Sequence, residues 1–194
     1  MDKHLDRWRD NVDELAAAIG NPPALKTVEL TATPCDRSID GAMEFHGHDA
    51  TREEVKRQVV GLIEHAERGR FVHELHRAMV MRELQAPVLV IAVHHDQRAK
   101  LHREDPSDAY FDHGERAGTA YLFEPDGKLV CAGAFEATSS DQVEWTKYTY
   151  GHETEEEKRG VITDGDDISV RSALDRDLDK RMHQALAASL KRVQ

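Results

Sequence analysis

Apolar residues near the beginning of the chain recur at the spacing of one helix face. The intervals alternate between three and four residues, at Leu5, Trp8, Val12, Leu15 and Ile19. Such a seam is typical of an amphipathic α-helix, and Gly20 followed by Pro22-Pro23 is typical of a helix end. We therefore expect an N-terminal amphipathic helix and a Pro-containing linker over residues 1–23. The helix could lie on the rest of the molecule or form a stalk or dimerising segment, and we favour the first.

The next patterns predict two strands and two helices. Residues 26–34 alternate apolar and polar side chains, as a half-buried strand does, and residues 41–45 could be its antiparallel partner. Apolar residues return to helical spacing over residues 55–66 and again over residues 71–84. Both helices are expected to cover the sheet with their apolar faces.

A continuous apolar run at residues 87–93 predicts a strand in the interior of the sheet, because a strand that is buried on both faces does not alternate. Residues 97–117 are polar and contain Asp105-Pro106 and Gly114. This segment is expected to be a long loop, and loops of that length are often functional.

The clearest pattern is a hairpin around Glu124-Pro125-Asp126-Gly127. Proline suits the second position of a type I turn, aspartate the third, and glycine the position that follows. Strands are expected at residues 119–123 and 129–138. The alternation over residues 143–150 predicts a third antiparallel strand, which completes a meander.

The last pattern is a long C-terminal helix, because apolar residues share one helix face from residue 174 to residue 193. Together the elements predict an α+β fold. In this fold an antiparallel sheet with a C-terminal meander packs against two or three helices, including the long C-terminal helix. The chain of 194 residues fits one such domain over residues 24–194.

The charge of the chain argues against a nucleic-acid partner. There are 37 acidic and 26 basic residues, which give a formal net charge of −11, and no basic stripe overrides this field locally. The run at residues 87–93 is too short for insertion into a membrane. The first residues lack the apolar stretch of a signal peptide. We expect a cytoplasmic protein if Met1 is the native start and an extracytoplasmic one if an upstream signal or anchor was removed, with a slight preference for the second.

The two cysteines, Cys35 and Cys131, are too far apart for a CxxC metal or redox motif. Two independent thiols are the simpler interpretation. The alternative is one disulfide, since each cysteine lies in or beside a predicted strand. A bond that closes a loop of about 100 residues could contribute about 4–5 kcal/mol in the chain-entropy model.

Histidines are numerous, 12 in all, and they occur in clusters. Zinc and similar metals bind imidazole and carboxylate ligands that converge on one point. His94, His95 and Asp96 follow the apolar run, and the end of an interior strand is a common place for a ligand site. His46 and His48 could contribute to the same centre. Zinc or a similar divalent metal is therefore the alternative to our expectation that the chain binds no cofactor.

Residues 87–96, followed by residues 118–130, resemble the central strand and the terminal hairpin of thioredoxin-like proteins. This resemblance implies a thioredoxin-like fold. The chain departs from the family in three ways: it has no CxxC, no proline before the hairpin strand, and a predicted third strand where the family has a helix. A thioredoxin-like domain without the redox motif is therefore one alternative.

Motifs of common enzymes are absent from the sequence: there is no G-x-S-x-G elbow, glycine-rich phosphate loop or EF-hand loop. We therefore expect a non-enzymatic binding or assembly domain, which could be the soluble part of an envelope-associated protein. The polar segment at residues 97–117 and the first helix are available for contacts with a protein partner or a second copy. A metal-dependent hydrolase that uses the His/Asp cluster is the other alternative.

Overall fold

The computed structural model describes residues 3–46, 52–67, 86–105, 108–143 and 167–194. The chain falls into two compact units. The first holds Met1–Val93, Gly118–Phe135 and Leu186–Gln194, and the second holds His94–Ala117 and Glu136–Ala185. The expected boundary after residue 23 stays a prediction.

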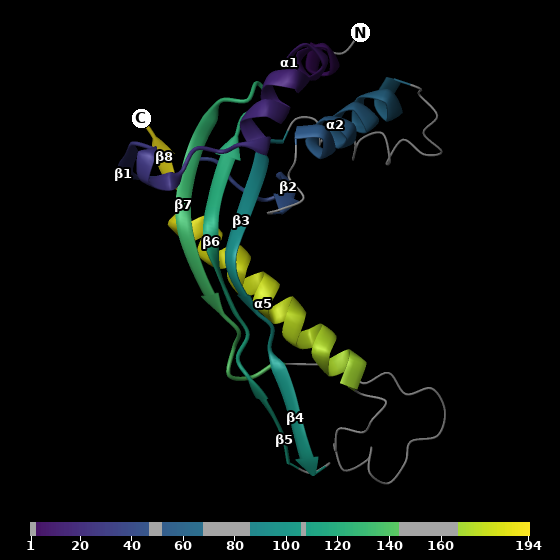
Figure 1. Cartoon of the computed structure of the whole chain (residues 1–194), viewed down its shortest axis with the longest axis vertical. Coiled ribbons are helices and arrows are strands. Elements are labelled where there is room, and N and C mark those ends of the chain that lie inside the picture. The colour runs from purple at the N-terminus through teal and green to yellow at the C-terminus, as the bar shows by residue number, and fades with distance from the viewer. Residues whose placement is uncertain (1–2, 47–51, 68–85, 106–107, 144–166) are drawn as a thin grey trace. The chain divides into compact units, whose positions relative to one another are not determined.

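The fold is α+β, with a mostly antiparallel mixed sheet (Figure 1). The helices of the described residues are α1 (Lys3–Gly20), α2 (Arg52–Glu67) and α5 (Asp167–Ser189), with a short 3-10 turn at Leu25–Thr27. The strands are β1 (Leu30–Pro34), β2 (Met43–His46), β3 (Val88–Gln97), β4 (Lys100–Asp105), β5 (Asp108–Asp112), β6 (Glu115–Phe123), β7 (Leu129–Thr138) and β8 (Lys191–Val193). The predicted helix at residues 71–84 and the predicted strand at residues 143–150 lie outside the described residues, apart from Val143.

Six strands form one sheet in the order β1-β8-β7-β6-β3-β2, and β4 and β5 form a separate two-stranded sheet. β8 pairs antiparallel with both β1 and β7. β3 lies in the interior of the larger sheet, and its residues from Val88 to Ile91 are buried. The interior position predicted from its continuous apolar run is therefore confirmed.

The partner predicted for the strand at residues 26–34 is wrong. β2 pairs with β3, in parallel, with Met43 opposite Val88 and His46 opposite Ile91. Parallel neighbours need a crossover connection, usually a helix, and α2 lies between these two strands in the chain. The place beside β1 is taken by β8.

The hairpin between β6 and β7 is confirmed. The backbone N–H of Gly127 donates to the carbonyl of Glu124 at 2.9 Å, the hydrogen bond that closes a β-turn. Gly127 has a φ of 80°, which a residue without a side chain adopts at little cost. The N–H of Lys128 donates to Oδ1 of Asp126 at 3.1 Å, so the aspartate also caps the turn.

Two other predictions are corrected. Residues 97–117 are not a loop, because they contain β4, β5 and the first residues of β6. Polar side chains on both faces of this segment hide the alternation by which a strand is recognised. The C-terminal helix ends at Ser189 rather than continuing to residue 193, and Lys191–Val193 form β8.

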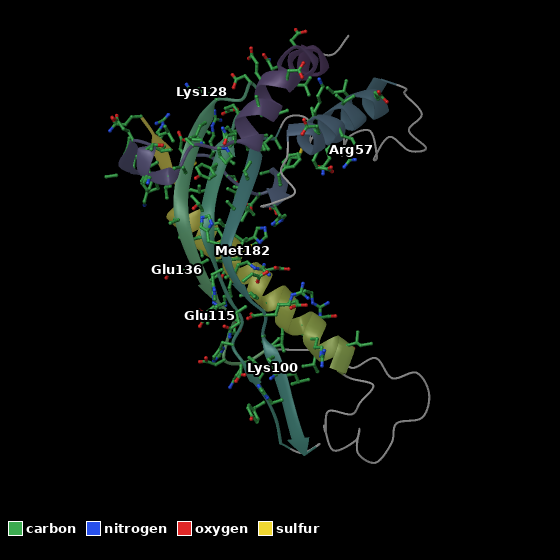
Figure 2. The ribbon with its side chains drawn as sticks, in the orientation of Figure 1. Arg57, Lys100, Glu115, Lys128, Glu136 and Met182 are labelled. Atoms are coloured by element: carbon green, nitrogen blue, oxygen red, sulfur yellow. A yellow bond between two sulfur atoms is a disulfide. The ribbon has the colours of Figure 1, made fainter. Side chains whose placement is uncertain are left out.

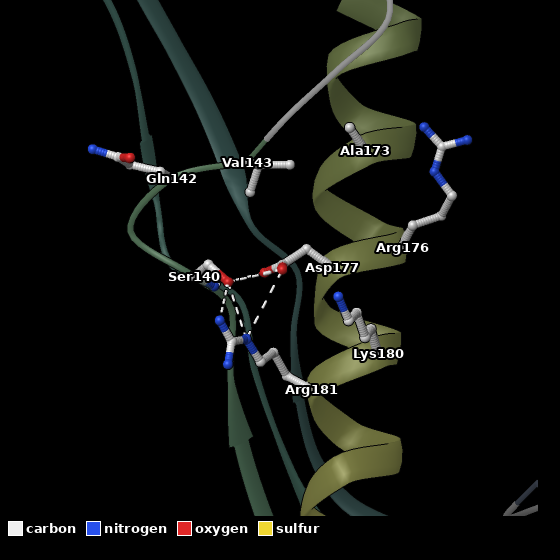
Figure 3. Close-up of a pocket in the computed structure, with 8 residues that line it drawn as sticks. All are labelled: Ser140, Gln142, Val143, Ala173, Arg176, Asp177, Lys180 and Arg181. Carbon is white, nitrogen blue, oxygen red and sulfur yellow. Dashed lines mark hydrogen bonds and ion pairs between the residues drawn. The ribbon is translucent and has the colours of Figure 1, made fainter.

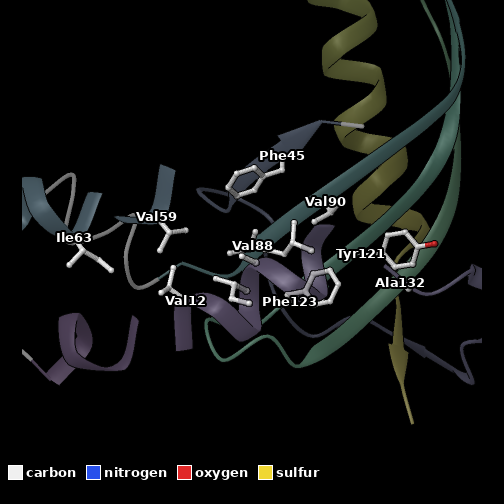
Figure 4. Close-up of a cluster of buried hydrophobic side chains, with 12 residues drawn as sticks. Val12, Phe45, Val59, Ile63, Val88, Val90, Tyr121, Phe123 and Ala132 are labelled. Carbon is white, nitrogen blue, oxygen red and sulfur yellow. The ribbon is translucent and has the colours of Figure 1, made fainter. Parts of the chain in front are cut away.

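The core of the first unit brings together α1, α2 and four strands (Figure 4). Its buried side chains are Val12, Leu15, Ala16 and Ile19 of α1, Val59 and Ile63 of α2, and Phe45, Val88, Val90, Tyr121, Phe123 and Ala132 of the sheet. Leu15 and Ile19 have no exposed surface, and burial of such a side chain contributes about 1.5–3 kcal/mol. The described part of the apolar seam of α1, formed by Val12, Leu15 and Ile19, therefore packs within this unit.

Candidate functional site

The predicted histidine cluster lies within β3, where His94, His95 and Asp96 are all exposed. His95 Nε2 lies 3.6 Å from Glu115 Oε2. Asp96 Oδ1 accepts a hydrogen bond from Arg116 Nε at 3.1 Å. The carboxylate that was predicted to bind a metal is thus engaged with a guanidinium.

Arg116 joins two carboxylates of the second unit. Besides Asp96, its Nη1 lies 2.6 Å from Asp179 Oδ1 on α5, and only 17 % of its side chain is exposed. Burial opposes the charge and would lower the pKa of Arg116, but the hydrogen bonds to Asp179 and Asp96 outweigh it and raise that pKa above its ordinary value. Arg116 therefore stays charged and connects β3, β6 and α5.

The other predicted metal ligands are not gathered into a centre. His46 Nε2 lies 3.5 Å from Glu44 Oε2 of the same strand. No three His, Cys, Asp or Glu side chains of the described residues are grouped so that they could hold a metal ion. His48 lies outside those residues, and a centre that includes His48 stays a prediction.

Cys35 and Cys131 have the geometry of a disulfide, with their sulfur atoms 2.01 Å and their Cα atoms 5.9 Å apart. Cys131 of β7 lies opposite Arg192 of β8. The backbone N–H of Cys35, just after β1, donates to the carbonyl of Leu190 at 3.0 Å. The bond thus joins β1 to β7 at the point where β8 begins.

A pocket lies between α5 and the turn that follows β7 (Figure 3). We call it the α5 pocket; it has a volume of about 460 Å³ and belongs entirely to the second unit. The lining residues are Ser140, Gln142, Val143, Ala173, Arg176, Asp177, Lys180 and Arg181. Pockets that take small molecules usually measure about 300–1,000 Å³, so this one has a suitable size.

Hydrogen bonds hold the turn of the pocket in place. The N–H and the hydroxyl of Ser140 donate to the two carboxylate oxygens of Asp177, at 2.6 and 2.8 Å. Arg181 donates to the same hydroxyl from Nε at 3.0 Å and from Nη2 at 2.7 Å. Next to them, Ser139 is buried, and it exchanges two hydrogen bonds of 2.9 Å with the backbone of Gly114. The polar groups of this wall are therefore already oriented.

The α5 pocket is positively charged although the chain is acidic. Three cations, Arg176, Lys180 and Arg181, line it with one carboxylate, Asp177, so the local sum is 3 − 1 = +2. Arg176 and Lys180 are exposed, and their side chains make no ion pair or hydrogen bond within the part of the chain that the structure describes. These two charges are available to a ligand.

The ribbon formed by β4 and β5, also in the second unit, carries aromatic rings on both faces. On one face, the ring of His102 stacks on that of Tyr110, with centroids 5.0 Å apart and an interplanar angle of 12°. His102 Nε2 lies 2.6 Å from Asp112 Oδ2. On the other face Leu101 lies opposite Phe111. Tyr110 is 50 % exposed.

Sequence reasoning missed both the α5 pocket and the ribbon. Ser139 and Ser140 had a sufficient explanation as turn residues, and the charges of α5 had one as a solvated helix face. The i, i+4 pairs Arg176/Lys180 and Asp177/Arg181 were a usable signal, because residues at that spacing lie on the same side of a helix.

No protein-family model, curated protein or solved structure matches this chain in the comparisons made with each of them. Within the described residues, no helix combines the length and the apolar character that are needed to cross a lipid bilayer.

Proposed function

We propose that the chain is a non-enzymatic binding or assembly domain that contacts protein through the β4–β5 ribbon. The observation that carries the proposal is the exposed ring of Tyr110, which is held by its stacking on His102. Tyrosine is enriched in protein interfaces. A ring that is already fixed in position loses little conformational freedom on binding.

The backbone of the ribbon supports the same function. Among the described residues β4 and β5 pair only with each other, so each strand has an outer edge that could accept a further strand. Lys100 and Asp112 lie opposite each other at the base of the ribbon, and such charges limit indiscriminate edge-to-edge pairing. The segment that was expected to make contacts as a loop can therefore make them as a ribbon.

Site-specific photo-crosslinking in the native host tests this proposal. A photoreactive residue at position 110 is expected to form crosslinks to protein, either a second copy or a partner. The matched control is position 128, because Lys128 is exposed in the turn between β6 and β7 (Figure 2). Sedimentation equilibrium of the purified chain then separates self-association from binding to another protein.

Substitution of the ring gives the second measurement. Tyr110→Ser should weaken the crosslinked or sedimenting complex by at least about tenfold, the effect of losing roughly 1.4 kcal/mol of binding free energy. Lys128→Ser should leave the complex unchanged. Equal crosslinking at both positions, or a complex that tolerates Tyr110→Ser, would contradict a role of the ribbon in assembly.

A location in or beyond the cell envelope is the second part of the proposal. The Cys35–Cys131 disulfide supports it, because disulfides persist in oxidising compartments and are rare in the cytosol. The test is to alkylate the native cells before lysis and count free thiols in the denatured, unreduced protein. Two free thiols would place the chain in a reducing compartment.

The two alternatives remain proposals with less support. The hydrolase would need a metal centre that includes residues outside the described ranges, such as His48, and stoichiometric zinc in the purified protein would favour it. The thioredoxin-like alternative is supported by the position of β3 beside the β6–β7 hairpin. The resemblance does not account for β8 and β1, which extend the sheet beyond that hairpin.

A further inference from the structure

We propose that the α5 pocket is a binding site for a small oxyanion, a phosphate or a carboxylate. The proposal is independent of the ribbon and goes beyond assembly. It rests on the excess positive charge of the pocket, the fixed geometry of its turn, and a volume that suits a small molecule.

Lys180 and Arg181 supply the donors. The ammonium of Lys180 has three N–H groups, and none of them is bound within the described residues. Arg181 uses Nε and Nη2 for Ser140 and has Nη1 left for a ligand, and its side chain is 48 % exposed. Hydrogen bonds between cations and oxyanions are roughly twice as strong as those between neutral groups.

Asp177 competes only weakly with a ligand for the donors of Lys180 and Arg181, because its carboxylate is already hydrogen-bonded to Ser140. Its side chain is 16 % exposed, and its two oxygens accept the N–H and the hydroxyl of Ser140. Arg181 Nε lies 4.0 Å from Asp177 Oδ1, so the ion pair between them is long. Asp177 is therefore a positioning residue that holds the turn, and the pocket keeps its excess positive charge.

The remaining walls indicate what the body of the ligand looks like. Val143 and Ala173 give the pocket an apolar side, which suits a short carbon chain or ring attached to the anion. The guanidinium of Arg176 points away from Ser140 in Figure 3, so Arg176 is expected to contribute less than Lys180 and Arg181.

Titration of the full, oxidised chain with two probes tests the site. Inorganic phosphate and succinate are added at constant ionic strength, and amide chemical shifts are followed by NMR. Saturable shifts at Ser140, Lys180 and Arg181 are expected with at least one probe. Binding of phosphate alone identifies a phosphate site, and binding of succinate alone identifies a carboxylate site. The absence of saturable shifts with both probes overturns the proposal.

Variants separate the site from general attraction to positive charge. Lys180→Ala removes a side chain without an internal partner, so the fold is retained, and the affinity is expected to fall roughly fivefold or more. Lys180→Arg should stay within about twofold of the unchanged chain. The matched control is Arg171→Ala, an exposed cation of α5 outside the pocket. Equal losses for Lys180→Ala and Arg171→Ala would overturn the proposal, without bearing on the ribbon.

Discussion

Tyr121 illustrates how one residue of the core ties stability to pH. It is 4 % exposed, and burial raises the pKa of its phenol above the ordinary value, while hydrogen bonds involving Thr119 and the backbone of Leu25 offset only part of this rise. The folded state thus holds the phenolic proton more tightly than the unfolded state does. The resulting stability is present below the unfolded pKa of about 10 and is lost as the pH rises through the folded pKa.

We predict that Tyr121 titrates above the ordinary range of a tyrosine. The tyrosinate absorbance of the folded chain should keep rising above the pH at which exposed tyrosines are complete, and Tyr121→Phe should remove this late part. Urea unfolding at increasing alkaline pH should show a shallower loss of stability for Tyr121→Phe than for the unchanged chain.

Two glycines have opposite roles that only the folded chain reveals. A Cβ at Gly133 of β7 would lie 2.5 Å from the carbonyl oxygen of Ser189, at the end of α5. A Cβ at Gly61 of α2 would meet no atom within 4 Å. Gly133 thus allows α5 to end against β7. Gly61 has no such role, and it destabilises α2 because glycine loses more conformational entropy on folding than alanine does.

The same substitution should therefore change stability in opposite directions at these positions. Gly133→Ala forces backbone apart and is expected to lower the free energy of unfolding by about 1–3 kcal/mol. Gly61→Ala should raise it by about 0.5–1 kcal/mol. Urea denaturation followed by circular dichroism measures both, and a neutral Gly133→Ala would mean that the end of α5 moves freely.

At the scale of elements, local sequence patterns predicted the structure correctly where a segment determines its own conformation. The β6–β7 turn was predicted because Pro125, Asp126 and Gly127 each fit one position of it. β8 was missed because Leu190 and Val193 also fit the apolar spacing of the helix before them. What makes Lys191–Val193 a strand is the pairing with β1 and β7, which no local pattern contains.

The α5 pocket could not be predicted from the sequence for a similar reason. Its walls come from the turn at residues 139–143 and from one side of α5, which are far apart in the chain. Each of these segments has an ordinary local explanation. The disulfide could be weighed from the sequence only as an alternative, because the distance between two distant strands depends on the order of the whole sheet.

β8 is expected to hold β1 in place. It lies between β1 and β7, and the N–H of Gln194 donates to the carbonyl of Glu29 at 3.0 Å. A chain that ends at Leu190 should therefore show faster hydrogen exchange at the amides of β1, because these lose their ladder partners. Arg192→Gln keeps the backbone of β8 and serves as the control. Unchanged protection of β1 in the shortened chain would mean that the disulfide alone fixes this strand.

At the scale of the molecule, charge and cross-linking act on different properties. The net charge of −11 predicts repulsion of polyanions at long range. The charge of the α5 pocket acts only over about a Debye length, roughly 8–10 Å in physiological salt. A small anion that reaches the pocket would therefore be affected mainly by Lys180 and Arg181, and we do not expect the net charge of the chain to prevent its binding.

The disulfide is expected to be the largest single contribution to stability. It closes a loop between positions 96 residues apart, and a cross-link over such a length removes about 4–5 kcal/mol of chain entropy from the unfolded state in the entropic model. Reduction, or the variant Cys35→Ala/Cys131→Ala, should lower the free energy of unfolding by this order. Urea titrations with and without a phosphine reductant measure the loss. The reductant should have no effect on the double variant, which separates cleavage of the bond from any other action of the reagent.

An oxidised chain no more stable than the double variant would contradict the prediction. It would show that the unfolded state already brings the two cysteines together, since a cross-link stabilises the folded state only by excluding unfolded conformations.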